Sequence, residues 1–327
     1  MSKIQNIGVL TSGGDAPGMN AAIRAVVRGS LYYQLKATGI LRGYDGLINA
    51  DFIPMEGKSV ANIIQRGGTI LKTARCDEFR TKEGRAKAYQ NLIDHQIDAL
   101  VVIGGDGTFT GANIFSQEYD FPIIGLPGTI DNDLEGTDLT IGYDTAINTV
   151  VNAVDKIRDT AESHDRLFIV EVMGRDSGLI ALRSGIGVGA EAILIPEAKM
   201  TTEDLVHRVE HGRKDKASKI IVVAEGDEAG GAYNVGEILK ENFPHHDIRV
   251  SVLGHIQRGG KPSCMDRVLA SRLGVAAVEG LLEGKSKMMV GQINKEIVFT
   301  PFEKAIKHID AAQISPAWLR LAEILSL

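Results

Sequence analysis

Short apolar runs recur along the first part of the chain, and segments with apolar positions at helical spacing separate them. The runs have the character of buried strands, which are predicted at residues 7–10, 38–41, 99–103 and 122–126. Helices are predicted from Met19 to Leu35, from Arg85 to His95 and from Gly111 through Ser116. Because strands and helices alternate with short connections, we expect a mostly parallel sheet covered on both faces.

The pattern changes near Gly142 and then resumes. A long helix is predicted from Asp144 to Glu162, and it is followed by strands at 167–172, 192–195, 220–224 and 250–253 and a helix at 266–282. We therefore predict an α/β protein with two Rossmann-like three-layer α/β/α domains, mostly parallel sheets, and an active site in the cleft between them. The larger domain comprises 1–142 and 257–307, and the smaller comprises 143–256 and 308–327.

Composition and charge limit the classes of function that are possible. Of 327 residues, 44% are hydrophobic and 24% are charged, which is typical of a globular protein. The net charge of −6 disfavours general binding to nucleic acid or anionic membranes, so an anion site must be a local cluster. No apolar run reaches the length of about 20 residues that a membrane span needs. Cys76 and Cys264 lack metal-ligand spacing, and no signal peptide precedes the first strand, so we expect a cytoplasmic protein.

Two segments rich in glycine and carboxylates, Gly104–Thr108 and Pro127–Asp133, follow predicted strands. Ligands bind at the carboxyl ends of parallel strands, and glycines let a phosphate approach the backbone. Asp106 has room for a hydrated cation such as Mg²⁺, while Asp131 and Asp133 can take separate roles as proton acceptor and support. The pair indicates phosphoryl transfer. A capping Asp106 and a purely structural Asx-rich loop are the alternatives.

The glycine-rich segment Thr11–Gly18 lies between a strand and a helix. It can bind an anion at the helix N-terminus, or it can be only a tight turn. It matches neither the P-loop nor the Gly-x-Gly-x-x-Gly pattern of dinucleotide-dependent oxidoreductases. Arginines near the ends of predicted strands suit phosphate recognition, although each alone could be a surface ion-pair partner; they are Arg166, Arg175, Arg249 and Arg258.

Taken in order, these motifs resemble those of the bacterial-type ATP-dependent 6-phosphofructokinases, and the resemblance covers essentially the whole chain. The motifs that carry it are Gly8–Asn20, Gly104–Thr108, Pro127–Asp133, Val172–Arg175 and Leu253–Gly260. Gly104–Thr108 alone is less specific, because NAD kinases and lipid kinases resemble it there. The resemblance implies transfer of the ATP γ-phosphoryl group to the 1-hydroxyl of fructose 6-phosphate. The products are fructose 1,6-bisphosphate and ADP, and this is the committed step of glycolysis.

The resemblance also implies roles for particular residues, with ATP on the larger domain and the sugar phosphate on the smaller. Asp131 would accept the hydroxyl proton, Thr129 and Arg175 would contact the transferring group, and Asp106 would hold Mg²⁺ with support from Asp133. Residues that would line ATP are Gly14, Arg75, Cys76, Gly105, Asp106, Gly107 and Thr108. Residues that would bind the sugar phosphate are Thr129, Asp131, Arg166, Met173, Gly174, Arg175, Glu225, Arg249, His255 and Arg258.

Assembly and regulation are further implications. In such enzymes Arg166 and Arg249 reach the sugar 6-phosphate of a neighbouring subunit, which implies a homotetramer built as a dimer of dimers. The resemblance implies ADP as an activator and phosphoenolpyruvate as an inhibitor at a site between subunits. The matching positions are Arg24, Arg28, Arg158, Gly189, Glu191, Lys214 and Lys216. Gly57 and Asn62 replace an arginine and an aspartate that are common in the family, so we expect an altered response to effectors.

The identity of the phosphoryl donor depends on two small residues. Pyrophosphate-dependent relatives resemble this chain but carry Asp and Lys at the positions of Gly107 and Gly128. An Asp at 107 would repel the α-phosphate of a nucleotide, so glycine at both positions favours ATP. A pyrophosphate-dependent phosphofructokinase remains an alternative. A non-catalytic regulator that binds a nucleotide or sugar phosphate is another, and the presence of Asp106 and Asp131 argues against it.

Overall fold

The computed structural model describes residues 4–163, 166–211, 219–227, 230–306 and 314–325. The chain divides into two compact units, each described by itself. Unit 1 comprises residues 1–130, 134–145 and 258–308, and unit 2 comprises 131–133, 146–257 and 309–327. The predicted domain boundaries and the ligand that each domain was predicted to bind stay predictions.

Unit 1 contains a sheet of seven strands. Their bounds are β1 Asn6–Thr11, β2 Lys36–Ile40, β3 Phe52–Met55, β4 Ala99–Gly104, β5 Ile123–Pro127, β10 Met288–Ile293 and β11 Glu296–Pro301. The order is β11-β10-β5-β4-β1-β2-β3, and neighbours are parallel except in the pairs β10–β11 and β2–β3. β1, β4 and β5 are buried along their whole length, as expected of central strands with helices on both faces.

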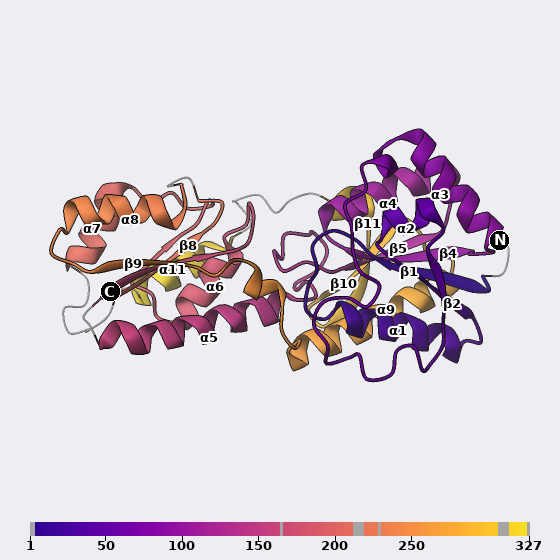
Figure 1. Ribbon diagram of the computed structural model, residues 1–327, viewed down its shortest axis with the longest axis horizontal. Coiled ribbons are helices and arrows are strands. Elements are labelled where there is room, and N and C mark those ends of the chain that lie inside the picture. Colours follow the sequence, from indigo (N-terminus) through magenta and orange to yellow (C-terminus); the bar gives the residue numbers. More distant parts are fainter. Residues whose placement is uncertain (1–3, 164–165, 212–218, 228–229, 307–313, 326–327) are drawn as a thin grey trace. The chain divides into compact units, whose positions relative to one another are not determined.

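Helices cover both faces of this sheet. Figure 1 shows α1 and α9 on one face and α2, α3 and α4 on the other. Their bounds are α1 Met19–Tyr32, α2 Tyr44–Asn49, α3 Lys82–Asp94, α4 Asp106–Tyr119 and α9 Cys264–Leu282, with the shorter segments η1 Glu78–Arg80 and α10 Phe302–Ala305. A core cluster that includes Leu10, Val102, Phe109 and Phe115 lies under α2, α3 and α4.

Three details of unit 1 differ from the sequence-based prediction. α1 ends at Tyr32 rather than Leu35, because Gln34 takes a left-handed conformation with φ 60°. α4 begins at Asp106 rather than Gly111, because residues 106–108, which sequence analysis interpreted as a ligand-binding turn, already form the first turn of the helix. Residues 44–49, for which no helix was predicted, form the short helix α2.

Unit 2 contains a sheet of four parallel strands in the order β7-β8-β6-β9. Their bounds are β6 Leu167–Val172, β7 Ala192–Leu194, β8 Lys219–Ala224 and β9 Ile248–Val252. The prediction of two mostly parallel α/β sheets is therefore confirmed. The last strand starts two residues earlier than predicted, which places Arg249 inside β9.

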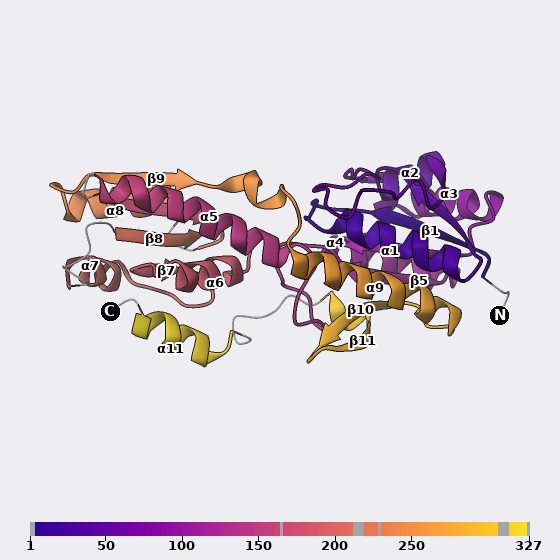
Figure 2. The same ribbon diagram turned by 90° about the horizontal axis from the view of Figure 1, so that it is seen from below.

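The helices of unit 2 also lie on both faces of its sheet. α7 and α8 lie on one face, and α5 and α6 lie on the other (Figure 1). α11 lies beside α6 (Figure 2). The bounds are α5 Tyr143–Glu162, α6 Leu179–Gly187, α7 Thr202–His211, α8 Gly231–Asn242, η2 Gly254–Arg258 and α11 Pro316–Leu325. Within the described part of the chain, no helix is both long and apolar enough to cross a membrane.

Candidate active site

Three turns meet at the carboxyl edge of the unit 1 sheet, and we number them turn 1 (12–18), turn 2 (105–108) and turn 3 (128–133). They follow β1, β4 and β5, which are parallel neighbours. Backbone hydrogen bonds tie them together: Ser12 N donates to Ile103 O at 2.9 Å, and Gly128 N donates to Gly104 O at 2.9 Å. The order of the strands therefore brings together the segments that sequence analysis selected.

Turn 1 leads from β1 into α1. Its carbonyl at Gly13 accepts a hydrogen bond from the Thr73 hydroxyl, and Arg258 Nη1 donates to Asp15 O at 3.2 Å. The arginine lies so close to Gly14 that a Cβ there would come within 2.5 Å of Nη1. Arg258, predicted with the sugar-binding residues, thus lies against the turn predicted to bind ATP.

Turn 2 starts helix α4. Asp106 is half-buried in the first helical turn, where backbone N–H groups point outward and can receive phosphate oxygens. Thr108 is buried, and its carbonyl accepts a hydrogen bond from Tyr44 Oη at 2.5 Å. Tyr44 stacks on Phe79 with ring centroids 4.0 Å apart, and burial strongly raises the pKa of its hydroxyl, so it stays a neutral donor. The core therefore fixes this end of α4.

Turn 3 carries the predicted base. Thr129, Asp131 and Asp133 are all buried. The Thr129 carbonyl accepts a hydrogen bond from Thr140 Oγ1 at 2.6 Å. Thr129 also lies beside turn 2, because a Cβ on Gly105 would fall 3.4 Å from its Cβ. Thr129 groups with unit 1, whereas the segment Asp131–Asp133 groups with unit 2.

The side chains of these turns fit Mg²⁺. Among the described residues no group of three or more His, Cys, Asp or Glu side chains could hold a metal ion, so a cage made of protein ligands alone is not indicated. Mg²⁺ instead binds through one or two carboxylates, with substrate phosphates and water completing its shell. A half-buried Asp106 at the start of a helix supplies such a carboxylate.

The carboxyl edge of the unit 2 sheet gathers most of the predicted sugar-binding residues. Met173–Arg175 follows β6, Glu225 follows β8 and His255 follows β9, and these three strands are neighbours. Glu225 Oε1 accepts hydrogen bonds from Arg175 N at 2.8 Å and from Gly174 N at 3.3 Å. This carboxylate therefore shapes the turn after β6 as well as being available to a ligand.

Gln257 is a residue that sequence analysis passed over. It is fully buried, and its Oε1 accepts a hydrogen bond from Met173 N at 3.2 Å. Its Nε2 donates to Gly254 O at 3.1 Å, so it links the turn after β6 to η2. Its place within the motif Leu253–Gly260 was the available signal, but only His255 and Arg258 were selected from that motif.

Arg166 and Arg249 lie at the amino edge of the unit 2 sheet. They share one carboxylate: Arg166 Nε lies 2.5 Å from Asp247 Oδ2, and Arg249 Nε lies 2.9 Å from Asp247 Oδ1. The hydrogen bond from Arg166, with a further one from Arg249, holds the pKa of Asp247 below its ordinary value. The length of β6, about 20 Å for six residues, separates them from Met173 of the same chain.

The residues predicted for the effector site fall in both units. Arg24 and Arg28 lie on α1 of unit 1. In unit 2, Arg158 donates from Nη2 to Val188 O at 2.5 Å, next to Gly189. Glu191 is buried and its Oε2 accepts a hydrogen bond from Ile220 N at 2.5 Å, so part of its role is internal. Lys214 and Lys216 lie outside the described residues.

Arg75 and Cys76 precede η1 in unit 1. Arg75 is exposed, whereas Cys76 is half-buried and packs against the core cluster under α2, α3 and α4. Burial raises the pKa of the Cys76 thiol, which lowers its thiolate fraction and disfavours it as a nucleophile.

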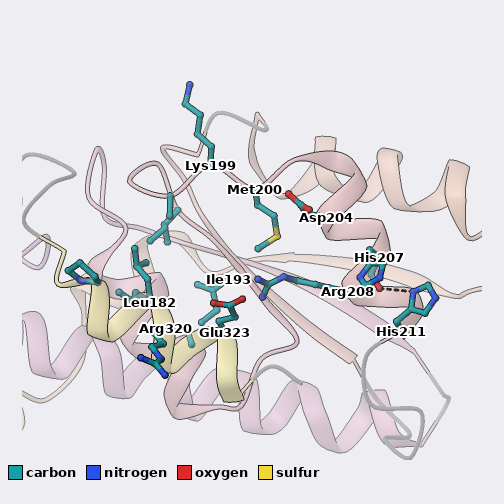
Figure 3. Close-up of a pocket in the computed structure, with 15 residues that line it drawn as sticks. Leu182, Ile193, Lys199, Met200, Asp204, His207, Arg208, His211, Arg320 and Glu323 are labelled. Atoms are coloured by element: carbon teal, nitrogen blue, oxygen red, sulfur yellow. Dashed lines mark hydrogen bonds between the residues drawn. The ribbon is translucent and has the colours of Figure 1, made fainter.

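A cavity of about 750 Å³ lies in unit 2 between α11 and the segment from β7 to α7 (Figure 3). None of the residues predicted for catalysis or ligand binding is among those described as lining it. Arg208 and Glu323 point toward each other, while Lys199 and Arg320 point away from the cavity. Because its cationic groups do not converge on one point, the cavity has no geometry that favours a particular ligand.

The fold and the candidate site together indicate a class of enzyme. Glycine-rich turns and carboxylates at the edge of a parallel α/β sheet, with arginines on a second such sheet, are typical of enzymes that transfer phosphoryl groups. Residues 6–281 match the family model described as Phosphofructokinase. The chain belongs to the phosphofructokinase family.

Curated relatives cover nearly the whole chain. The ATP-dependent 6-phosphofructokinase 2 of Bacteroides thetaiotaomicron is 57% identical over 309 residues, which are 94% of this chain and 95% of that protein. The ATP-dependent 6-phosphofructokinase 1 of Thermus thermophilus is 53% identical over 325 residues, 99% of this chain and 100% of that protein. Among solved structures, phosphofructokinase from Saccharomyces cerevisiae superposes with a TM-score of 0.89 at 37% identity, covering 98% of this chain and 48% of that one.

Proposed function

We propose that this protein is an ATP-dependent 6-phosphofructokinase, which transfers the γ-phosphoryl group of ATP to the 1-hydroxyl of fructose 6-phosphate and releases fructose 1,6-bisphosphate and ADP. The observation that carries the proposal is identity above half, over nearly the full length, to curated proteins named for this activity. A glycolytic role follows from the same reaction. The phosphate-compatible turns and the separate arginine-bearing edge support it.

Unit 1 supplies the donor half of the reaction. Turns 1 and 2 present backbone N–H groups beside the start of α1 and α4, and Gly14, Gly105 and Thr108 line that edge. Arg75 and Cys76 would complete the ATP site. Gly107 is exposed, and no atom of the described residues lies within 4 Å of the place where its Cβ would be, so the nucleotide phosphates have room there.

Asp131 is the proposed proton acceptor for the attacking hydroxyl, and Thr129 and Arg175 would contact the transferring group. Phosphoryl transfer depends mainly on alignment and on stabilising charge at the equatorial oxygens, so the rigid packing of turn 3 suits the role. Asp106, supported by Asp133, would hold Mg²⁺. When bound, this ion neutralises developing charge on the phosphate oxygens.

The acceptor half belongs to unit 2. Met173, Gly174, Glu225 and His255 would bind the sugar, and Arg258, the last residue of η2, would join them. The distant position of Arg166 and Arg249, at the amino edge of the same sheet, supports the idea that they serve the 6-phosphate of a neighbouring subunit. We therefore infer a homo-oligomer, with a tetramer as the form that the resemblance implies.

Regulation by ADP and phosphoenolpyruvate is the least direct part of the proposal. Arg24, Arg28, Arg158, Gly189 and Glu191 would take part in the effector site. Gly57 has space for a larger side chain: within the described part of the chain, only Leu31 Cδ1 lies near its Cβ position, at 3.9 Å, so the missing arginine leaves a gap. We expect a response to both effectors that is weaker than with an arginine present.

A coupled assay with fructose 6-phosphate tests the proposal, using ATP and pyrophosphate as alternative donors. We expect kcat/KM with ATP to exceed that with pyrophosphate by at least about 100-fold, because donor selection rests on charge and space around the α-phosphate. Turnover with pyrophosphate alone would show the alternative enzyme, and no turnover with either donor would favour a binding regulator.

A further inference from the structure

Asp266 is a buried carboxylate that the proposed reaction does not use. It lies in the first turn of α9 and is 0% exposed. Its Oδ1 accepts a hydrogen bond from Gly142 N at 2.8 Å, and its Oδ2 accepts one from Thr145 N at 2.8 Å and another from the Thr145 hydroxyl. One side chain thus satisfies three donors that are more than a hundred positions away in the sequence.

The surroundings of Asp266 explain how a carboxylate can be buried here. Gly142 and Thr145 flank the start of α5, so the carboxylate caps that helix, and it also lies near the N-terminus of its own helix. Both helix ends favour negative charge. Burial raises the pKa of Asp266, while hydrogen bonds from Thr145 and Gly142 act in the opposite direction. Ser263 caps α9 by accepting a hydrogen bond from Asp266 N at 3.2 Å.

The segment that Asp266 holds runs directly along turn 3. Ile141 pairs with Gly128 in a parallel bridge, and Ile141 N donates to Pro127 O at 2.8 Å. Thr140 Oγ1 donates to Thr129 O at 2.6 Å. Every residue from 140 to 142 is therefore bonded either to the end of β5 and turn 3 or to Asp266.

The other side of the same segment contacts turn 1. A Cβ on Gly142 would fall 2.7 Å from the Cβ of Ala16, and a Cβ on Gly18 would fall 2.6 Å from Ile141 Cγ2. Both distances are shorter than an ordinary contact between carbon atoms, so the two segments pack with no space for a side chain at either glycine. A displacement of Gly142 would therefore move both turn 1 and turn 3.

We propose that Asp266 is a positioning residue for phosphoryl transfer: by fixing Gly142–Thr145 it holds turns 1 and 3 in register, so that the donor phosphates and the proton acceptor keep their alignment. The inference rests on the proposed function. It assigns Asp266 no contact with substrate, and its effect passes through the 140–142 segment.

The test compares steady-state kinetics of Asp266→Asn and Thr145→Val with those of the wild type, using ATP and fructose 6-phosphate. In Asp266→Asn an amide NH₂ replaces one acceptor oxygen and faces N–H donors, and we expect kcat to fall about 10- to 100-fold. KM for fructose 6-phosphate should change less than about threefold, because most of the proposed sugar-binding residues follow β6, β8 and β9 of unit 2, where Glu225 holds the turn after β6. Thr145→Val should lower kcat by a smaller factor, and Thr145→Ser should restore it.

Glu118→Gln is the stability-matched control. Glu118 pairs with Arg85 elsewhere in unit 1, with Arg85 Nε to Glu118 Oε2 at 2.6 Å, so its loss weakens the fold without touching the turns. We expect this variant to lose stability but keep its kcat. Equal kcat in wild type, Asp266→Asn and Thr145→Val, at a temperature where all are folded, would overturn the inference.

Two results would call for a different measurement: an Asp266→Asn variant that does not fold, and a wild type that is inactive. If Asp266→Asn does not fold, Thr145→Val with its Ser rescue decides the question. It removes the Thr145 hydroxyl, which donates to Asp266 Oδ2 and accepts a hydrogen bond from Ser263 N at 2.9 Å, and it leaves the two backbone donors to Asp266 in place. If the wild type itself does not phosphorylate fructose 6-phosphate, the proposed function fails. The positioning role is then tested by calorimetric binding of ADP, which Asp266→Asn should weaken by about tenfold and Glu118→Gln should leave unchanged; equal ADP affinity in all three proteins would contradict it.

Discussion

The carboxyl edges of the two sheets are built in different ways. In unit 1, turns 1 to 3 are tied mainly by backbone bonds and close packing, such as Gly128 N to Gly104 O at 2.9 Å. In unit 2, the turn after β6 depends on side chains: Glu225 accepts from Gly174 N and Arg175 N, and Gln257 accepts from Met173 N. The carboxyl edge of the unit 1 sheet, which we propose as the donor edge, is thus held mainly by packing and backbone bonds. The carboxyl edge of the unit 2 sheet, which we propose as the acceptor edge, is held by individual side chains.

This difference predicts how each edge responds to substitution. At the donor edge, most changes to exposed side chains should be tolerated, and the sensitive positions are glycines, the few side chains that would perform chemistry, and buried supports such as Asp266. At the acceptor edge, removing one carboxylate should disturb backbone geometry as well as ligand contact, since an N–H that loses its acceptor must find another. The following variants test that contrast.

Asp131→Asn should have the largest effect. If Asp131 accepts the hydroxyl proton, kcat should fall about 10²- to 10⁴-fold, the usual contribution of general base catalysis, with little change in KM for ATP. The neighbouring exposed Glu135→Gln is the matched control and should stay near wild type. Steady-state kinetics would refute the assignment if Asp131→Asn kept more than half of its activity.

Gly107→Asp tests the donor edge. Because the site around Gly107 is open, an Asp fits sterically, and its charge should repel the nucleotide phosphates by about 1–3 kcal/mol, lowering kcat/KM for ATP about 10- to 100-fold. Gly107→Ala adds no charge, so its kcat/KM for ATP should fall much less. Equal losses in both variants would point to shape rather than charge. Gly128 is a poorer test, since a Cβ there would lie 2.9 Å from Ile103 Cγ2.

Glu225→Ala tests the acceptor edge. Losing the acceptor for two backbone N–H groups should lower kcat/KM for fructose 6-phosphate about tenfold or more, while KM for ATP stays within twofold. Glu225→Gln keeps an acceptor oxygen, so its kcat/KM for fructose 6-phosphate should lie between those of the wild type and Glu225→Ala. Exposed Glu237→Ala, which loses only a surface pair with Lys240, is the control. If Glu225→Ala changed KM for ATP and left kcat/KM for fructose 6-phosphate unchanged, the proposed roles of the two edges would be contradicted.

Glu118→Gln should have the smallest effect, on stability alone. Its bidentate pairing with Arg85 lowers the pKa of Glu118 in the folded state, so the ion pair stabilises the protein above the unfolded-state pKa. We expect a loss of about 1–2 kcal/mol at neutral pH. Urea unfolding at several pH values should show this difference vanish as pH falls through the lowered pKa. If the stability difference between the wild type and Glu118→Gln did not depend on pH, the ion pair would not be its cause.

The sequence was most informative where strands are buried. β6 was predicted with both of its bounds, because Leu167–Val172 is apolar almost throughout and ends at glycine and charged residues. The short β10–β11 hairpin was missed: its turn uses Asn294 and Lys295, both with positive φ, instead of the Asn-Gly signal that would have marked it. Short helices such as α2 were missed because one turn gives no periodicity.

For the site, the sequence identified the segments but not the residues that support them. Turns 1 to 3 follow buried strands, so their meeting could be predicted from the order of elements. Asp266 was taken only as the first residue of a helix, because its partners Gly142 and Thr145 lie more than a hundred positions away. Asp247 was likewise not selected, since nothing local marks a carboxylate shared by Arg166 and Arg249.

Phosphorus NMR of the wild-type reaction tests the central claim most directly. With Mg²⁺, ATP and fructose 6-phosphate, we expect the γ-phosphate resonance of ATP to be replaced, one for one, by a new phosphomonoester resonance at C1 of the sugar. Loss of the γ-phosphate to inorganic phosphate without a new ester, or formation of the ester only when pyrophosphate replaces ATP, would contradict the account.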